Sequence, residues 1–157
     1  MPGYYFDTSA LAKLYRMEVG SDVVDRLHSE RGSQHLISRL AIVEMESVFA
    51  LKVRTGEIGR TAALIARRRL EADLGCGRLL VAAVHDEHFR SARQLLFKYG
   101  VTESLRTLDA LQLSVALGLK RAGLATVFVA ADQKLCRAAA LEGFAVTNPK
   151  QPVSLVI

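Results

Sequence analysis

Cysteine, tryptophan and long apolar runs are scarce or missing in this sequence, and each absence excludes a class of protein. Only two of the 157 residues are cysteines, Cys76 and Cys136, and neither has a second cysteine or a histidine at the spacing of a metal site. A zinc finger, an iron–sulfur site and a disulfide framework are therefore not expected. Tryptophan is absent and aromatic residues make up only 6% of the chain, which argues against a surface on which nucleic-acid bases stack.

Membrane and export signals are missing as well. No apolar run approaches the roughly 18 residues that cross a bilayer. The first residues, MPGYYFD, lack the basic region and the long apolar region of a signal peptide. We therefore expect a cytoplasmic protein without a membrane segment.

The composition is that of a globular protein with a substantial core. Apolar residues make up 50% of the chain and charged residues 24%. Because 157 residues fit one domain, we expect a single domain over residues 1–157. Lysine and arginine number 21 against 16 aspartates and glutamates, which gives a net charge of +5. This basic balance is compatible with a phosphate-rich partner, although solvated surface charge explains it equally well.

Short apolar segments alternate along the chain with segments of helical pattern. Strands are expected over residues 4–6, 34–37, 79–84, 126–130 and 144–147. Helices are expected over residues 10–15, 21–30, 38–53, 60–74, 87–99, 107–122 and 133–142. Because the strand segments are apolar throughout, the pattern predicts a parallel sheet covered by helices on both faces. Ligands of such sheets bind beyond the carboxyl ends of the strands.

Two aspartates fall at that edge. Asp7 directly follows the strand expected over residues 4–6, and Asp132 follows the strand over 126–130 after one residue. Each also precedes an expected helix, so a role as helix N-cap is the simpler explanation of each aspartate taken singly.

Two further carboxylates are expected inside helices. Asp109 lies one turn into the helix over residues 107–122, where compensation of the helix dipole would also explain it. Glu44 interrupts an apolar stripe of the helix over residues 38–53. The other members of this stripe are Leu40, Val48 and Leu51. Since a carboxylate without a partner on an apolar face is costly, Glu44 should meet a cation or a hydrogen-bond network. Glu46 also stands between apolar residues, so periodicity alone does not choose between these two glutamates.

The segments around these acids resemble the four acidic motifs of the PIN-domain nucleases, and most closely those of the VapC-type toxins of prokaryotic toxin–antitoxin modules. The segments are YFDTSAL at 5–11, SRLAIVE at 38–44, LDALQL at 108–113 and VAADQKL at 129–135. The resemblance covers nearly the whole chain, including the ending EGFAVTNP at 142–149. One departure is the pair of alanines before Asp132, where many members carry a hydroxyl residue; it affects a local hydrogen bond and leaves the carboxylate in place.

The resemblance implies a PIN fold, which is an α/β fold of three layers, α/β/α, around a central parallel sheet. In this fold Asp7, Glu44, Asp109 and Asp132 meet in one cleft. Two carboxylates about 6 Å apart repel each other by about 3 kcal/mol at an effective dielectric constant of about 20, so these four acids together need a cation. Oxygen ligands favour Mg²⁺ or Mn²⁺ over zinc.

The activity implied by the resemblance is that of a Mg²⁺-dependent endoribonuclease, in which Mn²⁺ can substitute for Mg²⁺. We expect Asp7 and Asp109 to be the primary metal ligands, with the other two acids acting directly or through water. Thr8 or Ser9 would orient Asp7 or bind a water on the metal. The metal would lower the pKa of a bound water, a carboxylate would help to remove its proton, and the ion would screen the charge that develops on the phosphate.

The resemblance also implies partners. VapC-type proteins usually form homodimers and bind an antitoxin protein, so we expect both here, together with an RNA substrate. The helix expected over residues 60–74 and the residues before it are basic and could hold the RNA backbone, although a solvated helix face explains them equally well. These basic residues are Lys52, Arg54, Arg60, Arg67, Arg68 and Arg69. Leu64, Ile65 and Leu70 of the same helix could line a dimer interface or an antitoxin groove.

Three other interpretations stay open. A PIN nuclease could process RNA without an antitoxin, which a small antitoxin gene immediately upstream would argue against. A non-catalytic PIN scaffold is disfavoured because all four acids are retained. The phosphatases that form an aspartyl-phosphate also place an aspartate after the first strand, but their motif is Asp-x-Asp. This chain has Ser9 in place of the second aspartate and so lacks the general acid.

Overall fold

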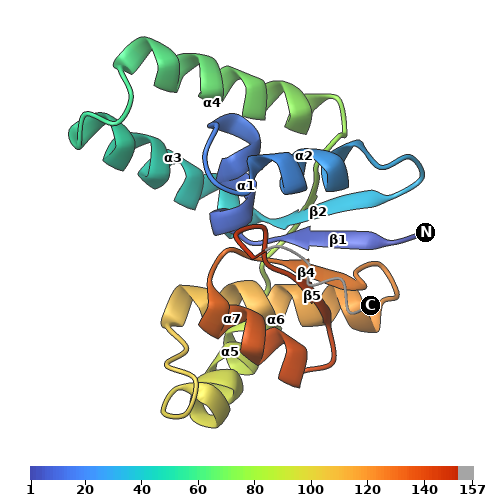
Figure 1. The fold of residues 1–157 in the computed structure, drawn as a ribbon. Helices are drawn as coiled ribbons and strands as arrows, with labels where there is room; N and C mark the ends of the chain where they lie inside the picture. The colour runs from blue at the N-terminus through green and yellow to red at the C-terminus, as the bar shows by residue number, and fades with distance from the viewer. Residues whose placement is uncertain (152–157) are drawn as a thin grey trace.

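A five-stranded parallel sheet forms the centre of the computed structural model, which describes residues 1–151 (Figure 1). The strands are β1 (Gly3–Phe6), β2 (Gln34–Ser38), β3 (Leu80–Ala82), β4 (Val127–Val129) and β5 (Ala145–Thr147). They lie in the order β3-β2-β1-β4-β5, and every neighbouring pair is parallel. The chain adds β2 and β3 on one side of β1 and later adds β4 and β5 on the other, so the strand order reverses between β1 and β4. Sheets of this kind bind ligands at such a reversal.

Helices cover both faces of this sheet. Those found in residues 1–151 are α1 (Thr8–Tyr15), α2 (Ser21–Ser29), α3 (Arg39–Arg54), α4 (Arg60–Gly75), α5 (Asp86–Tyr99), α6 (Thr107–Arg121) and α7 (Gln133–Leu141). Helices α1 to α4 pack on one face and α5 to α7 on the other, which confirms the predicted three-layer α/β/α fold (Figure 1). None of them is both long enough and apolar enough to span a bilayer.

Strand β1 is covered on all sides, which explains why its side chains are apolar. It pairs with β2 on one edge and with β4 on the other. Since successive side chains of a strand point to opposite faces, Tyr5 packs in the core under α5 to α7, whereas Tyr4 and Phe6 pack in the core under α1 to α4. At the start of β1 a Cβ on Gly3 would stand 1.7 Å from the carbonyl oxygen of Leu124. Glycine therefore allows β1 to approach the segment that leads into β4.

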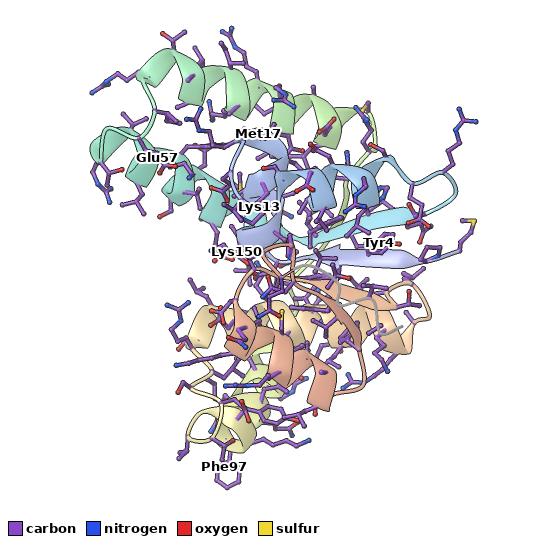
Figure 2. All side chains as sticks on the ribbon, in the orientation of Figure 1. Tyr4, Lys13, Met17, Glu57, Phe97 and Lys150 are labelled. Carbon is purple, nitrogen blue, oxygen red and sulfur yellow. The ribbon has the colours of Figure 1, made fainter. Side chains whose placement is uncertain are left out.

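A buried ion pair fixes the far end of α1. Lys13, labelled in Figure 2, is buried, and its Nζ lies 2.8 Å from Oε1 of Glu18. The other carboxylate oxygen of Glu18 binds Nζ of Lys52 on α3 at 3.2 Å, and Lys52 also binds Glu57 at 2.9 Å. Removing one partner of a buried pair leaves an uncompensated charge, which is strongly destabilising. These contacts therefore hold α1 in place, and the opposite end of α1 begins at Asp7.

All the predicted strands and helices are present, but the predicted strand over residues 79–84 is shorter and less covered than expected. It extends only over Leu80–Ala82, and Leu80 and Val81 are 40% and 43% exposed. The reason is its position, because β3 lies at the edge of the sheet.

The predicted apolar stripe of α3 is correct for Leu40 and Val48, which pack partly buried against the core, and wrong for Leu51. Leu51 is half exposed, and the residues that α3 buries are Ala41, Met45 and Phe49 instead. This buried stripe is displaced by one residue, which corresponds to a rotation of about 100° around the helix axis. Glu44 therefore does not interrupt the core-facing stripe but stands beside it.

Candidate functional site

Two aspartates stand at the carboxyl ends of parallel strands, as the sequence predicts, and the structure places these two strands on either side of the point where the strand order reverses. Asp7 follows β1 and Asp132 follows β4, and these strands pair with each other. The backbone N–H of Asp7 donates to the carbonyl oxygen of Val129 at 2.9 Å. Both aspartates also cap helices, because Oδ2 of Asp7 accepts from the backbone N–H of Ser9 at 3.1 Å and Oδ1 of Asp132 accepts from that of Lys134 at 2.9 Å. Capping thus occupies one carboxylate oxygen of each residue.

Ser9 connects the two turns that carry these aspartates. Its hydroxyl donates to Oδ2 of Asp7 at 2.6 Å and accepts from the backbone N–H of Ala131 at 3.0 Å. Of the two hydroxyl residues that the sequence offers for orienting Asp7, Ser9 is the one in contact with it. Ser9, in the segment after β1, therefore supplies the hydroxyl that connects the two turns. This connection does not need a hydroxyl residue directly before Asp132.

Glu44, and not Glu46, faces these turns from α3. Oε1 of Glu44 accepts from the hydroxyl of Thr8 at 3.1 Å and from Nε2 of Gln112 at 2.6 Å. Glu46 instead binds Arg67 of α4 at 2.6 Å. Two residues along a helix correspond to a rotation of about 200°, so the two glutamates point to different sides of α3.

Gln112 is the residue of this site that sequence reasoning missed. It is 1% exposed and lies on α6, one turn after Asp109. Its Nε2 donates to Glu44 and, at 3.2 Å, to the hydroxyl of Thr8, while its Oε1 accepts from the hydroxyl of Tyr5. The amide thereby connects β1, α1, α3 and α6. The available signal was the spacing of three residues from Asp109, which places both side chains on one face of the helix.

The remaining two acids share one cation. Nε of Arg106 lies 3.2 Å from Oδ2 of Asp109, and its Nη2 lies 3.8 Å from Oδ2 of Asp132. In residues 1–151, Arg106 is the one basic side chain within 4.0 Å of any of the four acids. Asp7 and Glu44 are held by neutral donors instead.

Burial and neighbouring negative charge raise the pKa of two of the acids in this cleft. The pKa of Asp7 is raised to about 6, chiefly by burial and to a smaller extent by the negative charges of Glu44 and Asp109, while its hydrogen bonds with Ser9 oppose the rise. Burial raises the pKa of Asp109 as well, and the charge of Asp132 adds to this rise, while Arg106 opposes it. The cleft therefore carries negative charge that its own residues compensate only in part.

The donor set of the cleft fits a hard divalent cation. The four acids offer only oxygen, while the histidines pack elsewhere, His35 against Tyr4 and His85 against His88. No three acidic, histidine or cysteine side chains of the described chain converge closely enough to enclose an ion as they stand. Mg²⁺ does not require such a cage, because it keeps several waters and is commonly held by one or two carboxylates. A cation here would also offset the repulsion that raises the pKa of Asp7.

Some of the basic residues predicted to hold RNA are engaged inside the molecule. Lys52 binds Glu18 and Glu57, Arg67 binds Glu46, and Arg69 lies over the ring of Tyr15 while donating to the carbonyl oxygen of Leu14. Arg54, Arg60 and Arg68 are the members of this group for which residues 1–151 offer neither an acidic partner within ion-pair distance nor a side-chain hydrogen bond. These three are therefore the most available for the predicted contact with RNA.

A groove of about 420 Å³ lies between α3 and α4. Its apolar lining residues are Phe49, Ala50, Val53, Ala63 and Leu64, and its charged lining residues are Glu46, Arg60 and Arg67. Leu64 and Ile65 are partly exposed, as a docking surface requires, but Leu70 is buried in the core. Leu70 is therefore not available to a partner, contrary to the prediction.

The family model of the PIN domain matches residues 4–141. The chain belongs to the PIN domain family. The match includes all four acids and extends from β1 to the end of α7. The resemblance to PIN domains seen in the sequence is thereby confirmed. A comparison with curated protein sequences finds no match.

Solved structures that share this PIN fold include VapC proteins. VapC20 of Mycobacterium tuberculosis, described as a toxin that cleaves the sarcin–ricin loop, is 20% identical, with a TM-score of 0.65 over 93% of this chain and 99% of that chain. FitAcB of Neisseria gonorrhoeae is 20% identical, with a TM-score of 0.60 over 95% and 99%. VapBC2 of Rickettsia felis, solved with a DNA fragment from its promoter, is 14% identical, with a TM-score of 0.58 over 93% and 98%. At these identities the likeness establishes a shared fold.

Replacing Asp7 by asparagine should stabilise the metal-free protein at neutral pH. Asparagine keeps an oxygen that can accept from Ser9 but does not ionise. Because the pKa of Asp7 is raised from 3.8 to about 6 in the folded state, the wild type has the full stability from this group below pH 4 and loses it as the pH rises through 6. A difference of two pKa units corresponds to about 3 kcal/mol. At pH 8 the free energy of unfolding of Asp7→Asn should therefore exceed that of the wild type by up to about 3 kcal/mol. Denaturant unfolding in the presence of EDTA, repeated from pH 4 to 8, measures this difference.

Asp25→Asn, at an exposed position of α2, removes the same charge elsewhere and is the control for net charge. The gain for Asp7→Asn should shrink towards pH 4. A gain that is as large at pH 4 as at pH 8 would show that ionisation of Asp7 is not its cause.

Replacing Gln112 by leucine should weaken both the fold and the site. Leucine has a similar size, but it leaves the buried hydroxyl of Tyr5 without its acceptor and Glu44 without its closest donor. Unsatisfied buried groups cost about 1–3 kcal/mol each, so the free energy of unfolding should fall by about 2–4 kcal/mol. Ser114→Ala is the matched control, since Ser114 is equally buried on α6 but bonds only to the carbonyl of Leu111. Equal stability of the two variants would refute the network role of Gln112.

Proposed function

We propose that this chain is a divalent-metal-dependent endoribonuclease that acts as the toxin of a type II toxin–antitoxin module. The observation that carries the proposal is the arrangement of four carboxylates at the reversal point of the sheet in a PIN domain. Asp7 and Asp132 come from the ends of paired strands, and Glu44 and Asp109 reach the same edge from α3 and α6. Similar solved structures support the toxin assignment, since one is described as a toxin that cleaves the sarcin–ricin loop.

In the proposed site Asp7 and Asp109 are the primary ligands of Mg²⁺ or Mn²⁺, and Glu44 and Asp132 complete the site directly or through water. A bound divalent cation supplies a water of lowered pKa and stabilises the negative charge that develops on the phosphate. Ser9 holds Oδ2 of Asp7, which fixes the direction of the other carboxylate oxygen.

Glu44 is the residue best prepared to receive the proton of the attacking water. Thr8 and Gln112 both donate to its Oε1, and no hydrogen bond within residues 1–151 involves its Oε2. The water oxygen forms a bond to phosphorus, its proton passes to Oε2, and the bond from phosphorus to the 3′ oxygen breaks. The leaving oxygen takes up a proton from solvent water and becomes a 3′-hydroxyl, the other product carries a 5′-phosphate, and Glu44 releases its proton to solvent. Neither the 2′-hydroxyl of RNA nor a histidine takes part.

The proposal predicts metal-dependent cleavage of RNA with defined ends. Wild-type protein should cut a labelled RNA in Mg²⁺ or Mn²⁺ and not in EDTA, leaving 5′-phosphate and 3′-hydroxyl ends. Asp7→Asn should reduce the rate at least about a hundredfold, which is the scale of losing a group that stabilises the transition state. Gel electrophoresis with end-specific enzymes identifies the products.

Asp25→Asn, purified in parallel, should keep the wild-type rate and controls for a contaminating nuclease. Products with 2′,3′-cyclic phosphate would overturn the proposed attack by water, because that product requires the 2′-hydroxyl as nucleophile. Absence of cleavage of any RNA in both metals would favour a non-catalytic PIN scaffold.

The groove between α3 and α4 is the proposed binding surface for an antitoxin. Its apolar lining suits the apolar face of an amphipathic segment, while Glu46, Arg60 and Arg67 can orient that segment by charge. Similar structures that contain partners, such as VapBC2 of Rickettsia felis, support a protein partner. A guanidinium of the partner could bind the carboxylates of the cleft in a bidentate way. Homodimer formation is also proposed, on the family resemblance alone.

Replacing Leu64 by arginine should release the protein from its antitoxin without impairing cleavage. Leu64 lines the groove, and a charge there would be buried without a partner when the groove is filled. The affinity for the protein encoded next to this gene should fall by at least about tenfold, and RNA cleavage should continue in its presence. Leu141→Arg, on an exposed residue of α7, is the matched control and should remain inhibited. If no neighbouring protein binds the wild type, an RNA-processing PIN nuclease without antitoxin becomes the better interpretation.

A further inference from the structure

Arg106 is the most exposed side chain in contact with the four acids. Its side chain is 78% exposed, yet it reaches Asp109 on its own helix and Asp132 at the start of α7. These two contacts are the ones that hold its guanidinium within residues 1–151. Its position directly before α6 places it at the mouth of the cleft.

The contacts of Arg106 are those of a replaceable counter-ion. The distance to Asp109 is 3.2 Å, and the distance to Asp132, 3.8 Å, is too long for a hydrogen bond. Exposed ion pairs of this kind contribute little to stability. A divalent cation carries twice the charge and would compete directly for the same carboxylates. Once those carboxylates bind a cation, the guanidinium loses its partners and is free to turn.

The space into which Arg106 can turn suits a phosphate group. A hollow of about 620 Å³ is lined in part by the two aspartates, whose charge a bound cation would neutralise. Arg106 and Lys134 supply positive charge to its lining, and Ser104 and Gln133 supply neutral polar groups. A guanidinium can bind a phosphate through two parallel hydrogen bonds, and an RNA strand that crosses the cleft brings such groups beside the cleaved bond.

We propose that Arg106 is a two-position residue: it neutralises Asp109 and Asp132 while the cleft lacks metal, and it binds an RNA phosphate once a divalent cation takes those carboxylates. This inference rests on the proposed nuclease function. It has a thermodynamic consequence, because a residue that must leave one ligand to bind the other couples the two binding events. Metal binding should strengthen RNA binding, and RNA should strengthen metal binding by the same factor.

The test compares wild type with Arg106→Gln in two binding assays. In the absence of RNA, Mn²⁺ should bind Arg106→Gln about two- to fivefold more tightly, because the competing cation is gone. Calorimetry or the electron paramagnetic resonance of free Mn²⁺ measures this affinity. Binding of a short fluorescent RNA, followed by anisotropy in the cleavage-deficient Glu44→Gln background, should weaken about tenfold in Mn²⁺ when Arg106 is replaced. The slope of the logarithm of RNA affinity against the logarithm of salt concentration should fall by about one.

Arg137→Gln is the matched control. Arg137, like Arg106, is an exposed arginine in an ion pair. Its partner is Glu103, at 3.0 Å, and it does not contact the four acids. It should leave Mn²⁺ affinity unchanged. Arg106→Lys, which keeps the charge without the bidentate geometry, should give intermediate RNA affinity and near-wild-type metal affinity. Circular dichroism before the titrations confirms that all variants are folded.

The possible failures are distinguishable. If Mn²⁺ binds wild type and Arg106→Gln equally, or if Arg137→Gln weakens RNA binding as much as Arg106→Gln does, the proposal for Arg106 is wrong while the nuclease assignment stands. If Mn²⁺ does not bind the wild type, the proposed function fails and the role of Arg106 fails with it.

Discussion

Repulsion among carboxylates is the constraint around which the rest of this site is organised. Four acids stand at one edge of the sheet, and the pKa of Asp7 is raised first by its burial and then by the negative charges of Glu44 and Asp109. For Asp7 and Glu44 the fold meets this cost with neutral hydrogen-bond donors. Ser9, Thr8 and Gln112 hold individual carboxylate oxygens without cancelling the charge. An arrangement of this kind keeps the cleft receptive to a cation, because a neutral donor orients a carboxylate but leaves its charge to be paired.

The surrounding architecture supplies the rigidity that this arrangement needs. Strand β1 is buried on every side, and the backbone of Asp7 is bonded to β4 as the strand ends. The buried contacts of Lys13 hold α1 from its other end. Side chains that repel one another would otherwise move apart, so the positions of the acids depend on backbone that has little freedom. Arg106 is the most exposed of the side chains that contact the acids.

The sequence predicts the strands, the helices and the two aspartates that follow strands because each of these leaves a local signal. A buried strand is uniformly apolar, and an aspartate after such a strand is recognisable within a few residues. Gln112 leaves a weaker signal, since its partners Tyr5 and Thr8 are 107 and 104 positions away in the chain. Periodicity does not choose between Glu44 and Glu46 for a related reason. Apolar residues stand around both glutamates on α3, and only the elements packed against the helix decide which side chain faces the acids.

The hydrogen bond between Ser9 and Ala131 joins residues 122 positions apart. A protein emerges from the ribosome in order, and contacts between distant segments form late because long loops must close first. The first three strands and four helices can therefore be complete in outline while the cleft still lacks α6, β4 and Asp132. Whatever chemistry the cleft performs must wait until nearly all of the chain has been released.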